Sequence, residues 1–169
     1  MIKNVIIVFL AALILFVLWT LVLENMYAYF LYYLVYLPVE ALPNTTLTLK
    51  IEAGYPLYTV SSIINNESYT WSLSGELFLL PIVLLLSWQV FLFTILPHKK
   101  AFKVCRNNVL VLVFSQFIYL FFLTLYWKSD TIRVIHDMMN NNLIVIVVFL
   151  IIKDTIRNHL LEIINPNYS

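Results

Sequence analysis

Glycine, cysteine and histidine are scarce in this chain of 169 residues. Two glycines leave no material for the glycine-rich loops that bind phosphate groups. The single cysteine, Cys105, excludes an internal disulfide and a zinc site made from several cysteines. The three histidines, His98, His136 and His159, lie far apart, and no metal-binding or nucleophile motif accompanies them. We therefore expect no cofactor, no metal site and no enzymatic activity.

Charge is the second scarcity. Charged residues make up 11% of the chain and hydrophobic residues 62%, whereas a soluble domain is about 25% charged and about 45–50% apolar. A chain of this size cannot bury that much apolar surface in a core of its own, so we expect the lipid bilayer to surround it. The formal net charge of +1 offers no concentrated basic face of the kind that nucleic-acid binding requires.

Four apolar segments predict membrane-spanning helices. Residues 5–23, 77–96 and 109–127 contain no charged residue, and about 20 helical residues cross the hydrocarbon core of a bilayer. The fourth segment, 138–155, is centred on the shorter apolar run 143–152 and is either a full span or a re-entrant or interfacial helix. We expect the first segment to remain as an anchor, because no small-residue cleavage site follows it. The prediction is an all-α membrane protein, a four-helix transmembrane bundle that makes the whole chain one domain.

Residues 38–76 are the exception, because they carry strand patterns. In "TLTLKIEA", residues 46–53, polar and apolar side chains alternate without interruption. Weaker alternation over 57–63 and 68–73 follows, with the turn-rich "INNES" between the two. We expect a small extracytoplasmic β-hairpin or sheet between helices 1 and 2. The tyrosine-rich stretch before it either extends the first helix or lies along the membrane surface, and we expect its prolines to end it.

A sheet this small is marginally stable alone, so its apolar face needs a cover. The tyrosine-rich stretch, the bilayer surface and a partner protein are the three candidates. We predict that this face docks a partner, which is expected to be another integral membrane protein. The residues of the predicted docking face are Leu47, Leu49, Ile51, Tyr69 and Trp71.

The basic residues predict the orientation. The loop 97–107, "PHKKAFKVCRN", has four basic residues and no acidic one, and short basic loops stay in the cytoplasm. With four spans, both termini are then cytoplasmic and the sheet lies outside, in an inner or plasma membrane or, alternatively, an organellar inner membrane. Asn44 and Asn66 begin N-glycosylation patterns in the outer segment, which are used only in a secretory pathway.

Polar side chains within or beside the apolar segments are candidates for contacts between helices. An amide group in lipid needs a hydrogen-bond partner, which a neighbouring helix can supply. Glu24 and Glu76 follow or precede apolar segments, and we expect their carboxylates to reach headgroup water. The predicted interhelical contacts are those of Gln89, Gln116, Asn140, Asn141 and Asn142.

Two further groups of residues suggest chemistry at first sight. His136 and Asp137 are neighbours in sequence, but adjacent side chains on a helix point in different directions, so we expect a solvated face. Arg133 and Asp137 have the spacing of a helix-surface ion pair. Cys105 precedes Arg106, and nearby positive charge favours a thiolate; with no histidine beside it in sequence, we expect an ordinary free thiol.

The layout of the chain resembles a known family. "LTLKIEA", "LSGELFLLPIVLLLSW" and "VLVLVFSQFIYLFF" are similar to the outer segment, second helix and third helix of the small membrane proteins found with exosortases. Exosortases are intramembrane sorting peptidases of Gram-negative bacteria. The chain differs from that family at the entry to the second helix, where Gly75 stands alone. The resemblance implies an accessory role beside a sorting enzyme, without peptidase activity.

Three functions follow from these observations. The first is a non-enzymatic accessory or structural subunit of a larger membrane complex, alongside an exosortase-type system. The second is a subunit of an organellar respiratory or ATP-synthase complex, because the Phe, Tyr, Ile, Asn and Leu bias suits an AT-rich genome. The third is a small transporter or channel component, which the lack of ionisable residues inside the predicted spans disfavours.

Overall fold

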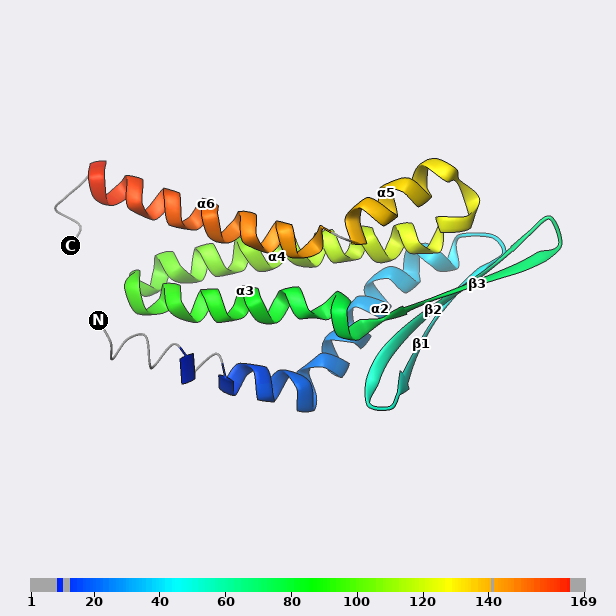
Figure 1. Cartoon of the computed structure of the whole chain (residues 1–169), viewed down its shortest axis with the longest axis horizontal. Coiled ribbons are helices and arrows are strands. Elements are labelled where there is room, and N and C mark those ends of the chain that lie inside the picture. The colour runs from blue at the N-terminus through cyan, green and yellow to red at the C-terminus, as the bar shows by residue number, and fades with distance from the viewer. Residues whose placement is uncertain (1–8, 11–12, 141, 165–169) are drawn as a thin grey trace.

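The computed structural model describes residues 9–10, 13–140 and 142–164, apart from the side chains of 76–78, 140 and 158–164. Figure 1 shows helices α3, α4 and α6 running side by side, with the sheet at one end of the molecule and α2 beneath it. The elements, in chain order, are the π-helix η1 (Trp19–Leu23), α2 (Glu24–Glu40), β1 (Thr45–Glu52), β2 (Tyr55–Ile64), β3 (Glu67–Ser74), α3 (Gly75–Ile95), α4 (His98–Thr124), the 3-10 helix η2 (Tyr126–Lys128), α5 (Asp130–Asn140) and α6 (Leu143–Ile164).

Two helices of the described chain are long and apolar enough to cross a membrane. They are Leu13–Glu40 and His98–Thr124. The pair Asp130–Met139 and Leu143–Arg157 is bent by 52° at its break, so it counts as one broken span or as a re-entrant loop. The apolar part of α3, Leu79–Ile95, is shorter. The fold is therefore mainly helical and has two or three candidate spans by length and composition, with the small sheet inserted between α2 and α3.

The first long helix continues past the apolar run 5–23. It runs through η1 and α2 to Glu40, so the tyrosine-rich stretch extends the first helix, which is one of the two predicted alternatives. Pro38 lies inside α2, and the helix ends two residues later. The position agrees with the expectation that prolines end this stretch, because a proline cannot donate a backbone N–H to the preceding turn. As a result, Glu24 stands within the helix rather than at its end.

The sheet has three antiparallel strands in the order β1-β2-β3, close to the three predicted strands. Both hairpin turns are formed by residues with positive φ, Ala53 and Gly54 in one and Asn65 and Asn66 in the other. Two-residue turns of this kind match the right-handed twist of the strands they join. The register pairs Leu47 with Val60 and Val60 with Trp71, so these three apolar side chains, one from each strand, lie on the same face.

The apolar face of the sheet lies on the helices. The hydroxyl group of Tyr58 donates a hydrogen bond to the backbone oxygen of Ala28 in α2, at 2.9 Å. At the junction of β3 and α3, Gly75 leaves no room for a side chain, because a Cβ atom there would lie 2.8 Å from the carbonyl oxygen of Pro56. The sheet is thus held at a fixed position by both helices that flank it in sequence.

Candidate functional site

A group of polar side chains is buried where α2, α4 and the sheet meet. We call it the sheet-side polar core: Glu24, Tyr27, Tyr58, Gln116 and Tyr119. Gln116 and Tyr119 are one turn apart on α4, and both are buried, at 0% and 1% exposure. The hydroxyl group of Tyr27 donates a hydrogen bond of 2.5 Å to Oε1 of Gln116, which links α2 to α4.

Glu24 belongs to this core. It is 6% exposed, against the expectation that it would reach water. Burial raises the pKa of the Tyr58 hydroxyl group, and the neighbouring Tyr27 and Glu24 raise it further. Tyr58 therefore stays a neutral hydrogen-bond donor. An ionisable residue buried among membrane helices is a candidate functional residue, because its burial is energetically costly.

Glu24 continues a buried stripe that the sequence already contains. Ala28, Leu31, Val35 and Val39 are the other buried residues of α2, and with Glu24 they are spaced by three or four residues, as one face of a helix requires. The spacing of these apolar residues, extended back by one turn, reaches Glu24. This pattern in the sequence could have predicted that Glu24 is buried.

His136 is also buried, which the sequence reasoning did not foresee. It is 2% exposed, its ring stacks on Tyr119 with centroids 4.4 Å apart, and the ring of Tyr126 meets it edge-on at 5.2 Å. Its Nδ1 atom is 3.3 Å from Oδ1 of Asp137, and its Nε2 atom has no hydrogen-bond partner among the described residues.

The predicted pairing of Arg133 with Asp137 is wrong. Arg133 pairs with Asp130 instead, at 2.9 Å and one turn earlier on α5. Asp137 contacts His136 and, at 3.5 Å, the hydroxyl group of Tyr126. The α5 helix therefore has its exposed ion pair at its start and turns the His136 ring inward, toward α4.

A second buried polar group, which the sequence reasoning missed, joins α3, α4 and α6 at the end of the bundle away from the sheet. Asp154 is 2% exposed. Its Oδ2 atom accepts hydrogen bonds from Nδ2 of Asn108 at 2.6 Å and from Nε1 of Trp88 at 3.4 Å. Lys153 donates to Oδ1 of Asn108 at 2.9 Å. One carboxylate thus accepts hydrogen bonds from donors on two other helices. We call Asp154, Asn108, Trp88 and Lys153 the carboxylate lock.

The predicted interhelical residues have different surroundings. Gln116 contacts another helix through Tyr27, as described above. Gln89 is 2% exposed, and neither atom of its amide has a hydrogen-bond partner among the described residues. Asn142 is exposed and donates to the backbone oxygen of Met138, so its bond stays within its own segment. Asn141 and the side chain of Asn140 lie outside the described residues.

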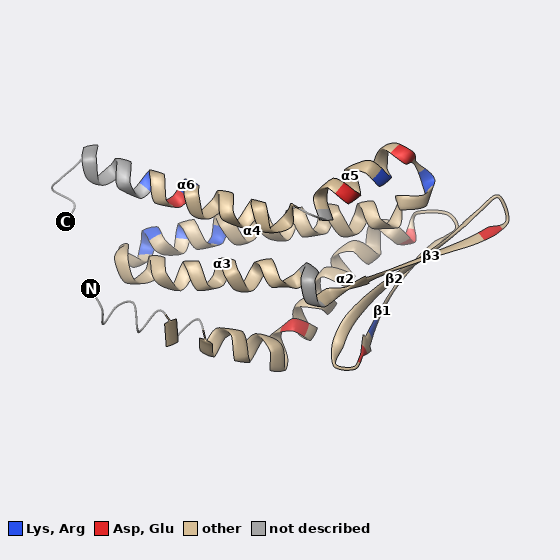
Figure 2. Cartoon of the chain, in the orientation of Figure 1, with Lys and Arg blue, Asp and Glu red and all other residues tan. Residues whose placement is uncertain are grey.

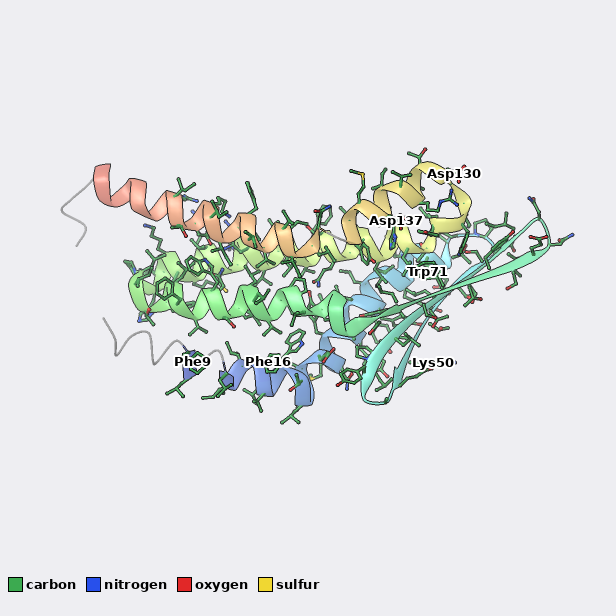
Figure 3. The ribbon with its side chains drawn as sticks, viewed as in Figure 1. Phe9, Phe16, Lys50, Trp71, Asp130 and Asp137 are labelled. Carbon is green, nitrogen blue, oxygen red and sulfur yellow. The ribbon has the colours of Figure 1, made fainter. Side chains whose placement is uncertain are left out.

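Most of the predicted docking face is covered by the chain itself. Leu47 is 4% exposed, and Tyr32 of α2 donates to its backbone oxygen at 3.4 Å. Trp71 stacks on Tyr126 at 5.1 Å, and Figure 3 shows it at the end of the sheet that meets the helices. The other three residues are Leu49, which is half-buried, Tyr69, which packs on Trp127, and Ile51, which like Trp71 is 38% exposed.

The opposite face of the sheet is open and carries hydroxyl groups. They form two cross-strand rows, which together we call the hydroxyl face. Within these rows, Oγ1 of Thr59 is 3.2 Å from Oγ of Ser72, and Oγ of Ser61 is 3.3 Å from Oγ1 of Thr70. One row is Thr46, Ser61 and Thr70, and the other is Thr48, Thr59 and Ser72.

Comparison of the chain with protein-family models, with curated proteins and with solved structures finds no match. Function therefore has to be argued from the geometry. The described residues contain no group of three or more His, Cys, Asp and Glu side chains that could hold a metal ion. What they do contain is two buried carboxyl groups in separate polar groups, a sheet fixed to the helices, and an open polar face on that sheet.

The hydrogen bond between Tyr27 and Gln116 can be tested by a double-mutant cycle. Gln116→Leu should lower the free energy of unfolding by about 1 kcal/mol, the usual worth of a hydrogen bond between membrane helices. In a protein that already carries Gln116→Leu, Tyr27→Phe should lower the free energy of unfolding by little more, because the hydrogen bond is already lost. Unfolding in detergent micelles measures both. Ser115→Ala, whose hydroxyl bonds only to its own helix, is the control, and additive costs would contradict the prediction.

Proposed function

We propose that this protein is a non-enzymatic accessory subunit of a larger membrane complex and that its hydroxyl face docks an extracytoplasmic part of a partner membrane protein. The observation that carries the proposal is the fixed position of the sheet. Its apolar face is bonded to α2 through Tyr58 and Ala28, whereas its polar face is open. A rigid, nearly uncharged polar surface is suited to binding by hydrogen bonds without the cost of burying charge.

The orientation is part of this proposal. Figure 2 shows Lys and Arg residues gathered on α4 and α6 at the end of the bundle away from the sheet. We place this end in the cytoplasm, since basic segments stay on that side, and the sheet outside. The exposed residues Lys99 and Lys50 mark the two sides. In a Cys105→Ser background, a membrane-impermeant maleimide added to intact cells should label Lys50→Cys and not Lys99→Cys. The reverse labelling would contradict the orientation.

A photo-crosslinking residue tests the docking surface. Placed at Ser72 on the hydroxyl face, benzoylphenylalanine should form an adduct with one partner, which mass spectrometry of a mild-detergent preparation would identify in stoichiometric amount. The same residue at Phe149, which is 64% exposed on α6, should not form this adduct. A monomer without any adduct at Ser72 would overturn the proposal.

The identity of the captured partner separates the two settings. The resemblance described above favours an exosortase-type sorting enzyme, and a neighbouring peptidase gene would agree with it. A respiratory or ATP-synthase subunit in the adduct, or a gene on an organellar genome, would favour the organellar alternative. Both outcomes keep the accessory function and differ only in the complex.

The burial of Glu24 favours a second candidate function, a transporter or channel component. The sequence argument against transport relied on the lack of ionisable groups inside the spans, and Glu24 is 6% exposed within the first long helix. Ion flux into liposomes should then fall with Glu24→Gln and stay unchanged with Glu40→Gln at the exposed end of the same helix. Absence of flux in the unmodified protein would end this alternative.

A further inference from the structure

One side of α4 is basic at its start and apolar further along. Lys99, Lys103 and Arg106 are exposed and are spaced by four and three residues, so they lie on the same side of the helix. That side is opposite the one that carries Asn108 and Leu112, which are both 0% exposed. The three cations therefore face away from the other helices.

The apolar part continues along the same side. Leu110 follows Arg106 by four residues and Phe114 follows Leu110 by four, and they are 60% and 62% exposed. We call the five residues Lys99, Lys103, Arg106, Leu110 and Phe114 the α4 stripe. From Lys99 to Phe114 the helix rises about 22 Å, which matches one leaflet of a bilayer, roughly half of the 40–45 Å total thickness. The stripe is thus cationic at headgroup depth and apolar at acyl-chain depth.

Among the described residues, no free carboxylate balances the positive charge of the stripe nearby. The sequence of α4 contains no acidic residue. On the adjacent α6, the carboxylate of Asp154 is buried and already bonded to Asn108 and Trp88. Arg157 of α6 is exposed and follows Asp154, which bonds to Asn108 of α4, by three residues, so it adds a further cation beside this part of α4. The α4 dipole also points its positive end this way, because the helix begins at His98.

We propose that the α4 stripe binds an anionic phospholipid, with its phosphate on Lys99, Lys103 and Arg106 and an acyl chain along Leu110 and Phe114. Basic clusters beside membrane helices recognise anionic headgroups through charge. The two exposed apolar side chains extend the contact to the acyl chain, which a soluble phosphate compound lacks. The stripe is on α4, and it is distinct from the hydroxyl face of the sheet. Lipid binding therefore holds or fails independently of the accessory function.

Native mass spectrometry of the full chain, with phosphatidylglycerol and phosphatidylcholine of identical acyl chains, tests the headgroup part. Neutralising all three cations of the stripe should weaken phosphatidylglycerol binding roughly 100-fold, since each cation near an anionic surface contributes roughly five-fold. Phosphatidylcholine binding should not change. The variant carries Lys99→Gln, Lys103→Gln and Arg106→Gln.

A matched control removes the same amount of charge elsewhere. Figure 3 shows Lys50 on the sheet, away from the start of α4. Three cations at the sheet end are replaced, and phosphatidylglycerol binding should stay within two-fold of the unmodified protein. An equal loss in both variants would mean that net charge alone attracts the lipid and would overturn the proposal. The control variant carries Lys50→Gln, Lys128→Gln and Arg133→Gln.

Two further measurements test the acyl-chain part and protect the result against misfolding. Leu110→Ala with Phe114→Ala should weaken phosphatidylglycerol binding, whereas Val145→Ala with Phe149→Ala on α6 should not. Glycerophosphoglycerol, the headgroup without acyl chains, should bind far more weakly than phosphatidylglycerol; equal binding would overturn a lipid site in favour of a simple phosphate site.

Single neutralisation of Lys103 is the fallback if the triple variant does not fold, and it should weaken phosphatidylglycerol binding roughly five-fold.

Discussion

Tyr58→Ala should lower the free energy of unfolding by about 3–5 kcal/mol, the range observed when a large aromatic side chain is removed from a core. The side chain is 0% exposed, so its loss leaves a cavity between the sheet and the helices. It also removes the hydrogen bond to the backbone oxygen of Ala28. Chemical unfolding in detergent micelles, followed by tryptophan fluorescence, measures the change.

Two variants separate the parts of this effect. Tyr58→Phe keeps the ring and removes only the hydroxyl group, so it should lower the free energy of unfolding by about 0.5–1.5 kcal/mol, the usual net worth of one hydrogen bond. The cost stays small because the Ala28 oxygen lies within α2 and still accepts a bond from its own helix. Thr59→Ala is the next residue on the opposite face of β2 and should change stability by less than about 0.5 kcal/mol. If Tyr58→Ala cost no more than Thr59→Ala, the sheet would not be anchored to α2 in the way described.

Asn108→Leu should be the second severe change, lowering the free energy of unfolding by about 3 kcal/mol, the upper range for hydrogen bonds to charged groups. The carboxylate lock depends on Asn108, whose Nδ2 atom is 2.6 Å from Oδ2 of the buried Asp154. Leucine fills a similar volume but leaves that carboxylate with the longer bond from Trp88 and the 3.5 Å ion pair with Lys153. Lys153 would lose its acceptor on Asn108 as well. Thermal unfolding in micelles should show the loss.

The neighbouring asparagine and a second-site change provide the controls. Asn107→Leu alters an exposed residue of the same helix and should be nearly neutral. In a protein that already carries Asp154→Leu, the cost of Asn108→Leu should shrink, since no buried carboxylate remains to be satisfied. Equal costs of Asn108→Leu in the two backgrounds would show that the carboxylate is not what makes Asn108 important.

The buried acidic residues show why the candidate sites could be only partly predicted. Asp154 was not among the predicted contact residues, yet Leu143, Val147 and Leu150 precede it with helical spacing and are buried. Spacing marks the face on which a side chain lies, but whether that face meets water or another helix depends on packing. Glu24 was misplaced for the same reason: it follows the apolar run 5–23 and was expected to reach headgroup water, whereas it is 6% exposed.

His136 adds a second reason. Adjacent residues on a helix point in different directions, which correctly argued against a dyad made from sequence neighbours alone. The ring is nevertheless buried, because α5 folds back on α4 and brings Tyr119 and Tyr126 around it. Those residues are 17 and 10 positions away in the sequence, and no local pattern records such contacts.

The sequence by itself determined the local features: long apolar helices, three short strands, turns and the basic segment at the start of α4. These follow from periodicity, from charge and from residues that favour particular backbone angles, all of which act within a few residues. Only the tertiary structure decided which side of each element is covered. The apolar face of the sheet lies on α2 and η2, and Glu24, His136 and Asp154 are enclosed between helices, because burial is set by contacts between segments distant in the chain.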